Sequence, residues 1–164
     1  MQTLEADPNI RHLTGQNCVI CQDPIRGGQI RAPCGHYYDI ACVTDLFQSA
    51  TRDESLFPPR CCRQPISFTA IHQHLTPVLI ALFTEKEKEF GTLKRVYCAK
   101  PSCSRFLGPQ SHIIFGSVMT CPAPGCLTRT CCSCRSKVAH GDLHRKCVVD
   151  EIDQQILALG KDAG

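Results

Sequence analysis

Residue types that bind zinc recur in close pairs along this 164-residue chain. Thirteen of its fourteen cysteines combine with two histidines and one aspartate into sixteen candidate metal ligands. Four tetrahedral zinc sites need that number, and close pairs separated by longer loops are typical of such sites. The candidates are Cys18, Cys21, Cys34, His36, Asp39, Cys42, Cys61, Cys62, Cys98, Cys103, Cys121, Cys126, Cys131, Cys134, His140 and Cys147. The sequence therefore predicts four Zn²⁺ ions as cofactors.

A large even number of cysteines is also typical of secreted, disulfide-bonded proteins. The chain begins MQTLEADPNIRHLTG, where no basic segment leads into an apolar run, so nothing there resembles a signal peptide. We therefore expect a cytoplasmic or nuclear protein, in which thiols stay reduced and available to zinc. No apolar run approaches the roughly 20 residues of a membrane-spanning helix, so no membrane association is expected.

The composition indicates that metal must stabilise the fold. Aromatic residues make up 6% of the chain and tryptophan is absent, so each cysteine-rich half would bury too little apolar surface to be stable alone. A structural zinc site contributes roughly 10–16 kcal/mol of apparent binding free energy. This is comparable with the whole stability of an ordinary domain, about 5–15 kcal/mol. The metal-free protein is therefore expected to be largely unfolded.

The spacing of apolar residues predicts the helices and strands that position the ligands. Asp39 to Ala50 is expected to form a short helix. A second, amphipathic helix lies between Thr76-Pro77 and Gly91; its apolar face holds Leu79, Leu82, Phe83 and Phe90. This helix is either a spacer that packs against one cysteine-rich module or a separate partner-binding helix. Ile113–Phe115 and Val118–Met119 are predicted to form a hairpin, and a final helix follows Cys147.

The first eight ligands, in the order Cys, Cys, Cys, His, Asp, Cys, Cys, Cys, resemble a RING finger with aspartate as the fifth ligand. The resemblance extends to Ile20, to the Cys-Gly-His turn and to Arg63 and Pro65 after the last ligand. It implies a cross-braced fold in which ligands one, two, five and six bind one zinc. The remaining four ligands would bind the other.

Two features of this cluster depart from the RING pattern. Asp39 offers an oxygen in place of a thiolate, and it is either a ligand or only a helix cap. Cys61 and Cys62 are adjacent, and neighbouring side chains of an extended segment point apart. Either a tight turn brings both to one metal, or one is replaced by His72 or His74.

The second eight ligands, Cys98 to Cys147, resemble an in-between-RING (IBR) module, whose first four ligands would hold one zinc and whose last four another. A RING, a helix and then this module is the order found in RING-in-between-RING (RBR) ubiquitin ligases. His140 fits the family spacing after Cys134 better, whereas His144 is nearer Cys147. We therefore predict His140 as the ligand. Cys132 remains outside the ligand set, either as an inert thiol or as a reactive one.

The resemblance implies a ubiquitin-protein transferase whose partners are a ubiquitin-conjugating enzyme and ubiquitin, with an unknown protein substrate. The conjugating enzyme would dock on the apolar residues Val19, Ile20, Leu46, Phe47 and Pro65. Such ligases pass ubiquitin through a catalytic cysteine in a third module, and no cysteine follows Cys147. The chain is a fragment, a shortened product or a natural two-module protein, so its own transferase activity stays open.

The expected architecture is a small zinc-stabilised α+β protein. Its segments are a flexible tail (1–14), a RING finger (15–67), a helical linker (68–92), an IBR module (93–150) and a final helix (151–164). The alternative functions are a non-catalytic zinc-finger adaptor and a nucleic-acid-binding zinc module. The second half of the chain is rich in basic residues, namely Lys94, Arg95, Lys100, Arg105, Arg129, Arg135 and Lys137. A net charge of +3 without a basic run favours nucleic acid only weakly.

Overall fold

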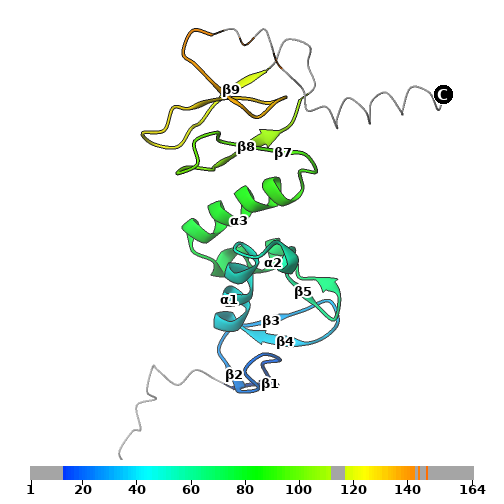
Figure 1. Cartoon of the computed structure of the whole chain (residues 1–164). Helices are drawn as coiled ribbons and strands as arrows, with labels where there is room; N and C mark the ends of the chain where they lie inside the picture. Colours follow the sequence, from blue (N-terminus) through cyan, green and yellow to red (C-terminus); the bar gives the residue numbers. More distant parts are fainter. Residues whose placement is uncertain (1–12, 112–116, 143, 145–146, 148–164) are drawn as a thin grey trace, which may run out of the picture. The chain divides into compact units, whose positions relative to one another are not determined.

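Short strands and helices alternate along the chain, which forms a small α+β protein (Figure 1). The computed structural model describes residues 13–111, 117–142, 144 and 147. The described residues belong to two compact units, Met1–Phe90 (unit 1) and Gly91–Gly164 (unit 2). Strand β1 begins at Leu13, within the segment predicted as a flexible tail. The predicted strand Ile113–Phe115 and the predicted final helix lie outside the described residues.

Three two-stranded antiparallel ribbons carry the ligand loops of unit 1. Strand β1 (Leu13–Asn17) pairs with β2 (Pro24–Arg26), and β3 (Gln29–Arg31) pairs with β4 (Tyr37–Asp39). The third ribbon consists of β5 (Arg60–Cys61) and β6 (Gln64–Pro65). The loops and ends of these ribbons bear seven of the eight predicted ligands. The eighth, Cys42, lies in the first turn of helix α1 (Ile40–Ala50).

Helix α1, which the sequence predicts, begins directly after Asp39, and Asp39 caps it. Asp39 Oδ1 accepts a hydrogen bond of 2.7 Å from the backbone N–H of Cys42, which satisfies one of the free donors of the first turn. Val43, Phe47 and Ala50 lie one turn apart and are fully buried. A 3-10 turn, η1 (Glu54–Leu56), follows the helix.

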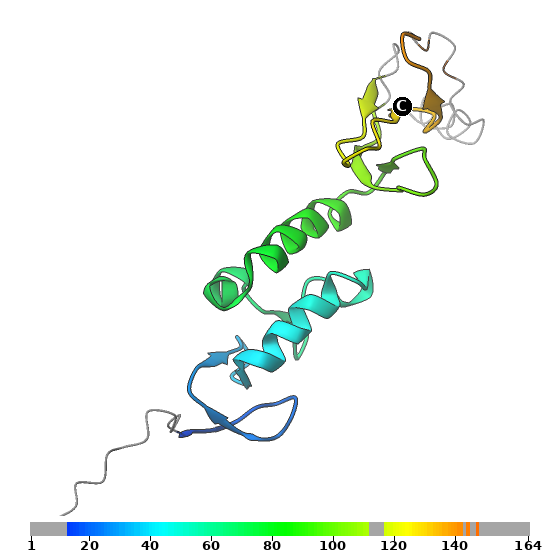
Figure 2. The ribbon, with the colours of Figure 1, turned by 90° about the vertical axis from the view of Figure 1, so that its left-hand side faces the viewer.

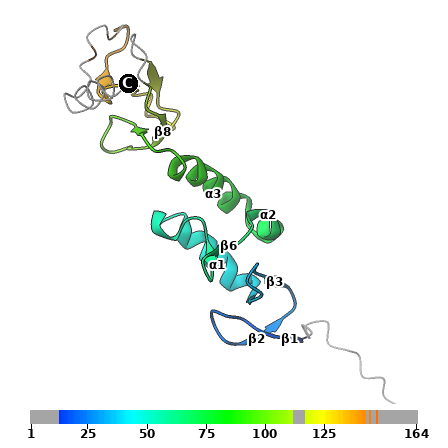
Figure 3. The ribbon, with the colours of Figure 1, turned by 90° about the vertical axis from the view of Figure 1, so that its right-hand side faces the viewer.

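The predicted linker helix is present as α3 (Pro77–Phe90), after α2 (Phe68–Ile71) and the 3-10 turn η2 (His72–His74). Thr76 Oγ1 accepts a hydrogen bond from the backbone N–H of Leu79, and Pro77 occupies the first helical position, where its missing N–H does no harm. Helix α3 lies alongside α1 within unit 1 (Figures 2 and 3). It therefore packs against the first cysteine-rich module.

Aromatic rings join helices α1, α2 and α3 of unit 1. The ring centroid of Phe83, on α3, lies 4.7 Å from that of Phe68, 4.8 Å from that of Phe57 and 5.1 Å from that of Phe47. Such pairs stabilise beyond the area that they bury. Leu82, predicted on the same face as Phe83, is 37% exposed and does not belong to this core.

Unit 2 is built of very short strands. Strand β7 (Arg95–Tyr97) pairs with β8 (Phe106–Pro109). A separate three-stranded sheet has the order β11-β10-β9, formed by Lys137–Val138, Arg129–Cys131 and Val118–Thr120. The predicted strand at Val118–Met119 is thus confirmed, and its partner among the described residues is β10.

Few apolar side chains are buried in unit 2. Among its described residues, Val96 and Val138 are the buried aliphatic side chains, and the others in its core are mostly cysteines. A core this small needs metal to be stable. None of the helices in the described part of the chain has the length and hydrophobicity of a membrane span.

Candidate metal centres

The side chains predicted as ligands gather into four groups, each with four ligand atoms within 4.8 Å of one another. The first group is Cys18, Cys21, Asp39 and Cys42, and the second is Cys34, His36, Cys61 and Cys62. The third group is Cys98, Cys103, Cys121 and Cys126, and the fourth is Cys131, Cys134, His144 and Cys147. Fifteen of the sixteen predicted ligands belong to these groups, and the exception is His140.

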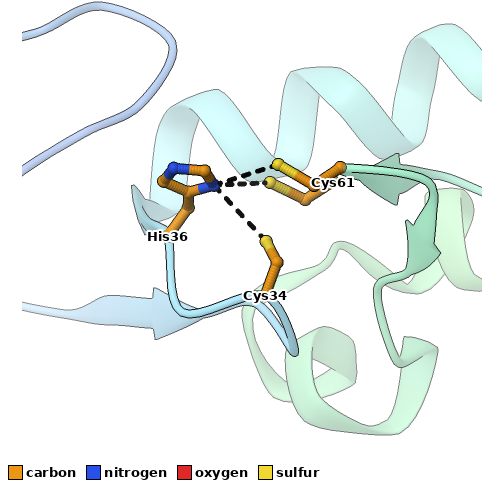
Figure 4. Close-up of side chains that lie close together, drawn as sticks. Cys34, His36 and Cys61 are labelled. Atoms are coloured by element: carbon orange, nitrogen blue, oxygen red, sulfur yellow. Dashed lines mark hydrogen bonds between the residues drawn. The ribbon is translucent and has the colours of Figure 1, made fainter.

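The second group has the dimensions of a tetrahedral zinc site. His36 Nδ1 lies 3.4 Å from Cys34 Sγ, 3.5 Å from Cys61 Sγ and 3.4 Å from Cys62 Sγ. Figure 4 shows the side chains of Cys34, His36 and Cys61 pointing toward one another. Zinc bonds of about 2.3 Å to sulfur and 2.0–2.1 Å to nitrogen would place N and S roughly 3.6 Å apart. The donor set and its spacing therefore fit zinc.

A tight turn explains how two adjacent cysteines join one group. Cys61 ends β5, Gln64 begins β6, and Cys62 and Arg63 form the two-residue loop between them. Both loop residues have positive φ, 48° and 67°, as in the type I′ turns of tight hairpins. The turn brings the Cys62 thiol to the same side as that of Cys61. The alternative ligands His72 and His74 belong to no group among the described residues.

The sequence left open whether Asp39 is a metal ligand or a helix cap, and in the structure it is placed for both roles. Its Oδ1 caps helix α1, while its Oδ2 lies 3.3 Å from Cys21 Sγ in the first group. Burial opposes ionisation of this carboxyl, but hydrogen bonds, chiefly that from the Cys42 backbone, lower its pKa to about 2. Asp39 is therefore an anion at neutral pH that offers one oxygen to a cation.

Sulfur atoms within the third group approach one another without bonding. The Sγ–Sγ distance is 3.6 Å for Cys98 and Cys126 and 3.7 Å for Cys103 and Cys121. A disulfide needs about 2.05 Å, whereas two thiolates on one zinc would lie roughly 3.8 Å apart. All fourteen cysteines are free. The distances fit shared metal ions rather than a disulfide framework.

The prediction of His140 as a ligand is wrong, because His144 completes the fourth group. His144 Nε2 lies 3.1 Å from Cys134 Sγ. The chain turns at Gly141 (φ 84°), and Asp142 Oδ1 then accepts a hydrogen bond of 2.8 Å from the His144 backbone N–H. This turn aims His144 at the cysteines and leaves His140 exposed.

Four ligand loops share a left-handed residue directly after their second cysteine. These residues are Gln22, Ser104, Leu127 and Arg135, with φ of 68°, 44°, 48° and 61°. At Gln22 and Arg135 the backbone N–H donates to the carbonyl of the first cysteine of the pair, at 2.9 and 3.0 Å. The left-handed turn closes each loop so that both thiols face the same point.

Leu127 is the apolar residue among these four, and it is 74% exposed. A left-handed conformation costs a non-glycine residue roughly 1–2 kcal/mol. We expect Leu127→Gly to relieve this strain. Leu93→Gly is the control, because Leu93 is fully exposed without a positive φ. Denaturation of the zinc-loaded variants should find Leu127→Gly more stable than Leu93→Gly by about 1 kcal/mol. Equal stabilities would contradict the strain.

Hydrogen bonds favour a thiolate in three of the groups. The backbone of His36 lowers the pKa of Cys34 to about 7, and the side chain and backbone of Thr128 lower that of Cys126 to about 6. Burial opposes ionisation of Cys134, but hydrogen bonds with Ser136 lower its pKa to about 6. Zinc binds the thiolate form, so these residues are ready ligands near neutral pH.

Cys132 belongs to no metal group and is 2% exposed. Its backbone N–H donates to the carbonyl of Ser117, at 2.7 Å. Burial raises the pKa of its thiol, and reactive cysteines have lowered pKa values and access to solvent. The structure therefore favours the inert alternative for Cys132.

The two units differ in how ligands alternate along the chain. In unit 1 the first group takes ligands one, two, five and six, and the second group takes three, four, seven and eight. Strand β4 accordingly follows His36 of the second group and ends at Asp39 of the first. In unit 2 the third group is complete before the fourth begins. Unit 1 is thus interleaved and unit 2 sequential.

The five residues predicted to contact a conjugating enzyme differ in exposure. Ile20 is 51% exposed and Pro65 is exposed, whereas Val19 and Leu46 are half-buried against the core. Phe47 is fully buried. A side chain inside the aromatic core offers no surface to a partner, so the prediction for Phe47 is wrong.

Several basic side chains of unit 2 are engaged within the unit. Arg129 donates to the carbonyls of Ala139 and Asp142, and Arg135 donates to Gln110 Oε1 at 3.1 Å. Arg95 Nε donates to the Thr92 carbonyl at 2.8 Å. These contacts occupy donors that a nucleic-acid phosphate would otherwise bind.

No protein-family model matches the chain, and no curated protein matches it. Among solved structures, one match is Parkin from Pediculus humanus bound to phospho-ubiquitin. The TM-score is 0.49 at 17% sequence identity, and the match covers 82% of this chain and 45% of that chain. The chain thus spans less than half the length of that Parkin chain.

Proposed function

We propose that the chain is the zinc-binding RING and IBR portion of an RBR-type ubiquitin ligase, and that unit 1 recruits a ubiquitin-conjugating enzyme. The observation that carries this proposal is the interleaving of the first and second groups. Interleaved pairs around two metals are the cross-brace that the RING resemblance implies. The sequential groups of unit 2 are what the IBR resemblance implies.

All four groups are structural zinc sites in this proposal. Each offers four protein ligands, which leaves no open position for a substrate or an activated water. Zinc contributes by holding the loops that carry it. We place the protein in the cytoplasm or nucleus, where its cysteines stay reduced.

Recruitment without thioester formation is the activity that the cysteines of this chain support. Thirteen cysteines are ligands and Cys132 is buried, so none offers a free and accessible thiol. A catalytic nucleophile needs a deprotonatable thiol that is not bound to zinc. In this proposal the chain binds the charged conjugating enzyme, and ubiquitin passes to an acceptor other than the cysteines of this chain.

Ile20 provides the test, because its side chain is 51% exposed and lies on the Cys18–Cys21 loop. Truncating a central apolar contact of an interface typically costs about 2 kcal/mol or more. We expect Ile20→Ala to weaken binding of a ubiquitin-conjugating enzyme roughly thirtyfold. Calorimetric titration with the zinc-loaded chain measures this.

Leu127→Ala is the matched control, since Leu127 is an exposed apolar residue of unit 2. It should bind as the wild-type chain does. Both variants should keep the full zinc content. Equal affinities of Ile20→Ala and Leu127→Ala, or no binding by the wild-type chain to any of a panel of conjugating enzymes, would contradict the proposal.

A further inference from the structure

The first group differs from the other three in its donor chemistry. A carboxylate oxygen of Asp39 takes a place that sulfur or nitrogen holds in the others. Thiolates suit zinc better than the harder carboxylate oxygen. Because the Cys42 backbone N–H already binds Asp39 Oδ1 at 2.7 Å, Oδ2 is the oxygen left for a metal. Asp39 is therefore a one-oxygen ligand, and the first group has the weakest donor set.

A hollow in unit 1 reaches this group. Its volume is about 580 Å³, and Cys21, Asp39 and Cys42 line it, so three of the four ligands face it. Cys21 is exposed to solvent, whereas Cys18 is buried and does not line the hollow. A small competing ligand in the hollow can approach the metal position without unfolding the unit.

We propose that the first group is an exchangeable zinc site, which releases its ion while the other three stay occupied. The ion passes to a competing zinc-binding ligand, and the thiolates of Cys18, Cys21 and Cys42 take up protons from water. Helix α1 keeps its cap, because Asp39 Oδ1 holds the Cys42 N–H whether or not Oδ2 binds a metal.

Release of this ion has a consequence for docking, which rests on the function proposed above. Val19 and Ile20 lie between two ligands of the first group, Cys18 and Cys21. Without metal, the Cys21 end of this loop is held to Asp39 by a thiol–carboxylate hydrogen bond of 3.3 Å, which is much weaker than a shared zinc ion. Zinc at the first group therefore controls whether the loop presents Ile20 to the conjugating enzyme.

Stepwise removal of zinc from the full chain, under reducing conditions, tests the exchange. Native mass spectrometry counts the ions during a chelator titration. Mutation of a residue that only orients a metal ligand typically lowers metal affinity at least tenfold. Replacing a ligand itself should therefore change zinc affinity by at least that factor. We expect a three-zinc species to persist over a roughly tenfold range of chelator concentration. Alkylation of that species should label Cys18, Cys21 and Cys42. Simultaneous loss of all four ions, or labelling of other cysteines first, would overturn the proposal.

Two variants separate the roles of Asp39. Asp39→Cys supplies a thiolate and should abolish the three-zinc species. Asp39→Asn keeps an oxygen that caps α1 but removes the charge, and it should be isolated with three ions and the far-UV spectrum of the wild-type chain. A three-zinc species that persists in Asp39→Cys would contradict the assignment, as would full zinc retention by Asp39→Asn.

Binding of the conjugating enzyme tests the consequence separately. The four-zinc chain should bind at least tenfold more tightly than the three-zinc species. Equal affinities would refute the coupling to docking. If the four-zinc chain does not bind, the proposed function fails, while the zinc count still decides the exchange.

Discussion

Removal of all metal from the reduced chain is expected to unfold both units. Each zinc site contributes roughly 10–16 kcal/mol of apparent binding free energy, whereas an ordinary domain is stable by about 5–15 kcal/mol in total. Without the ions, three or four thiols and their partners would also have to stay within 4.8 Å of one another with nothing between them. The loops that carry them would separate.

Far-UV circular dichroism and amide NMR spectra measure this unfolding. A chelator added with a thiol reductant should abolish amide dispersion, and an excess of Zn²⁺ should restore it. The reductant excludes oxidation of the freed cysteines as the cause. A chain that keeps its dispersed spectrum after losing all four ions would contradict the structural role of zinc.

Replacing Phe47 by alanine is expected to cause the largest loss of stability of any single apolar substitution in unit 1. Phe47 is fully buried, and its ring lies 5.1 Å from that of Phe83. Truncation of a buried phenylalanine to alanine costs about 3–5 kcal/mol, since it leaves a cavity. Loss of this ring also weakens the contact between α1 and α3.

Denaturant unfolding of the zinc-loaded chain measures this loss, with Val78→Ala as the control. Val78 lies on α3 and is 78% exposed, so its truncation should change stability by less than about 0.5 kcal/mol. If Phe47 instead contacted a partner, Phe47→Ala would behave as Val78→Ala does in unfolding and lose only partner binding. That result would overturn the placement of Phe47 in the core.

The positions of the helices could be predicted from the sequence because their signals are local. Asp39 before an apolar repeat, and Thr76-Pro77 before another, are caps and first-turn residues that act within a few positions. The ligand pairs could be recognised for the same reason. Leu82 and Phe47 show the limit, since the pattern marks an apolar face but not which part of it another element covers.

The details of ligation depend on backbone conformations that residue types do not reveal. No glycine marks the turn at Cys62 and Arg63, where both residues have positive φ. Likewise, the choice of His144 over His140 follows from the hydrogen bond between Asp142 and the His144 backbone. The spacing of residues along the chain favoured His140, because spacing alone takes no account of the turn at Gly141.

The number of zinc ions per chain is the most direct test of the central claim, that the ligands form four metal groups in which His144 completes the fourth. Native mass spectrometry of the reduced, zinc-loaded chain should give four ions for the wild type and for His140→Ala. The same measurement on His144→Ala should give three. Two ions or fewer in the wild type, or loss of an ion in His140→Ala rather than in His144→Ala, would contradict the account.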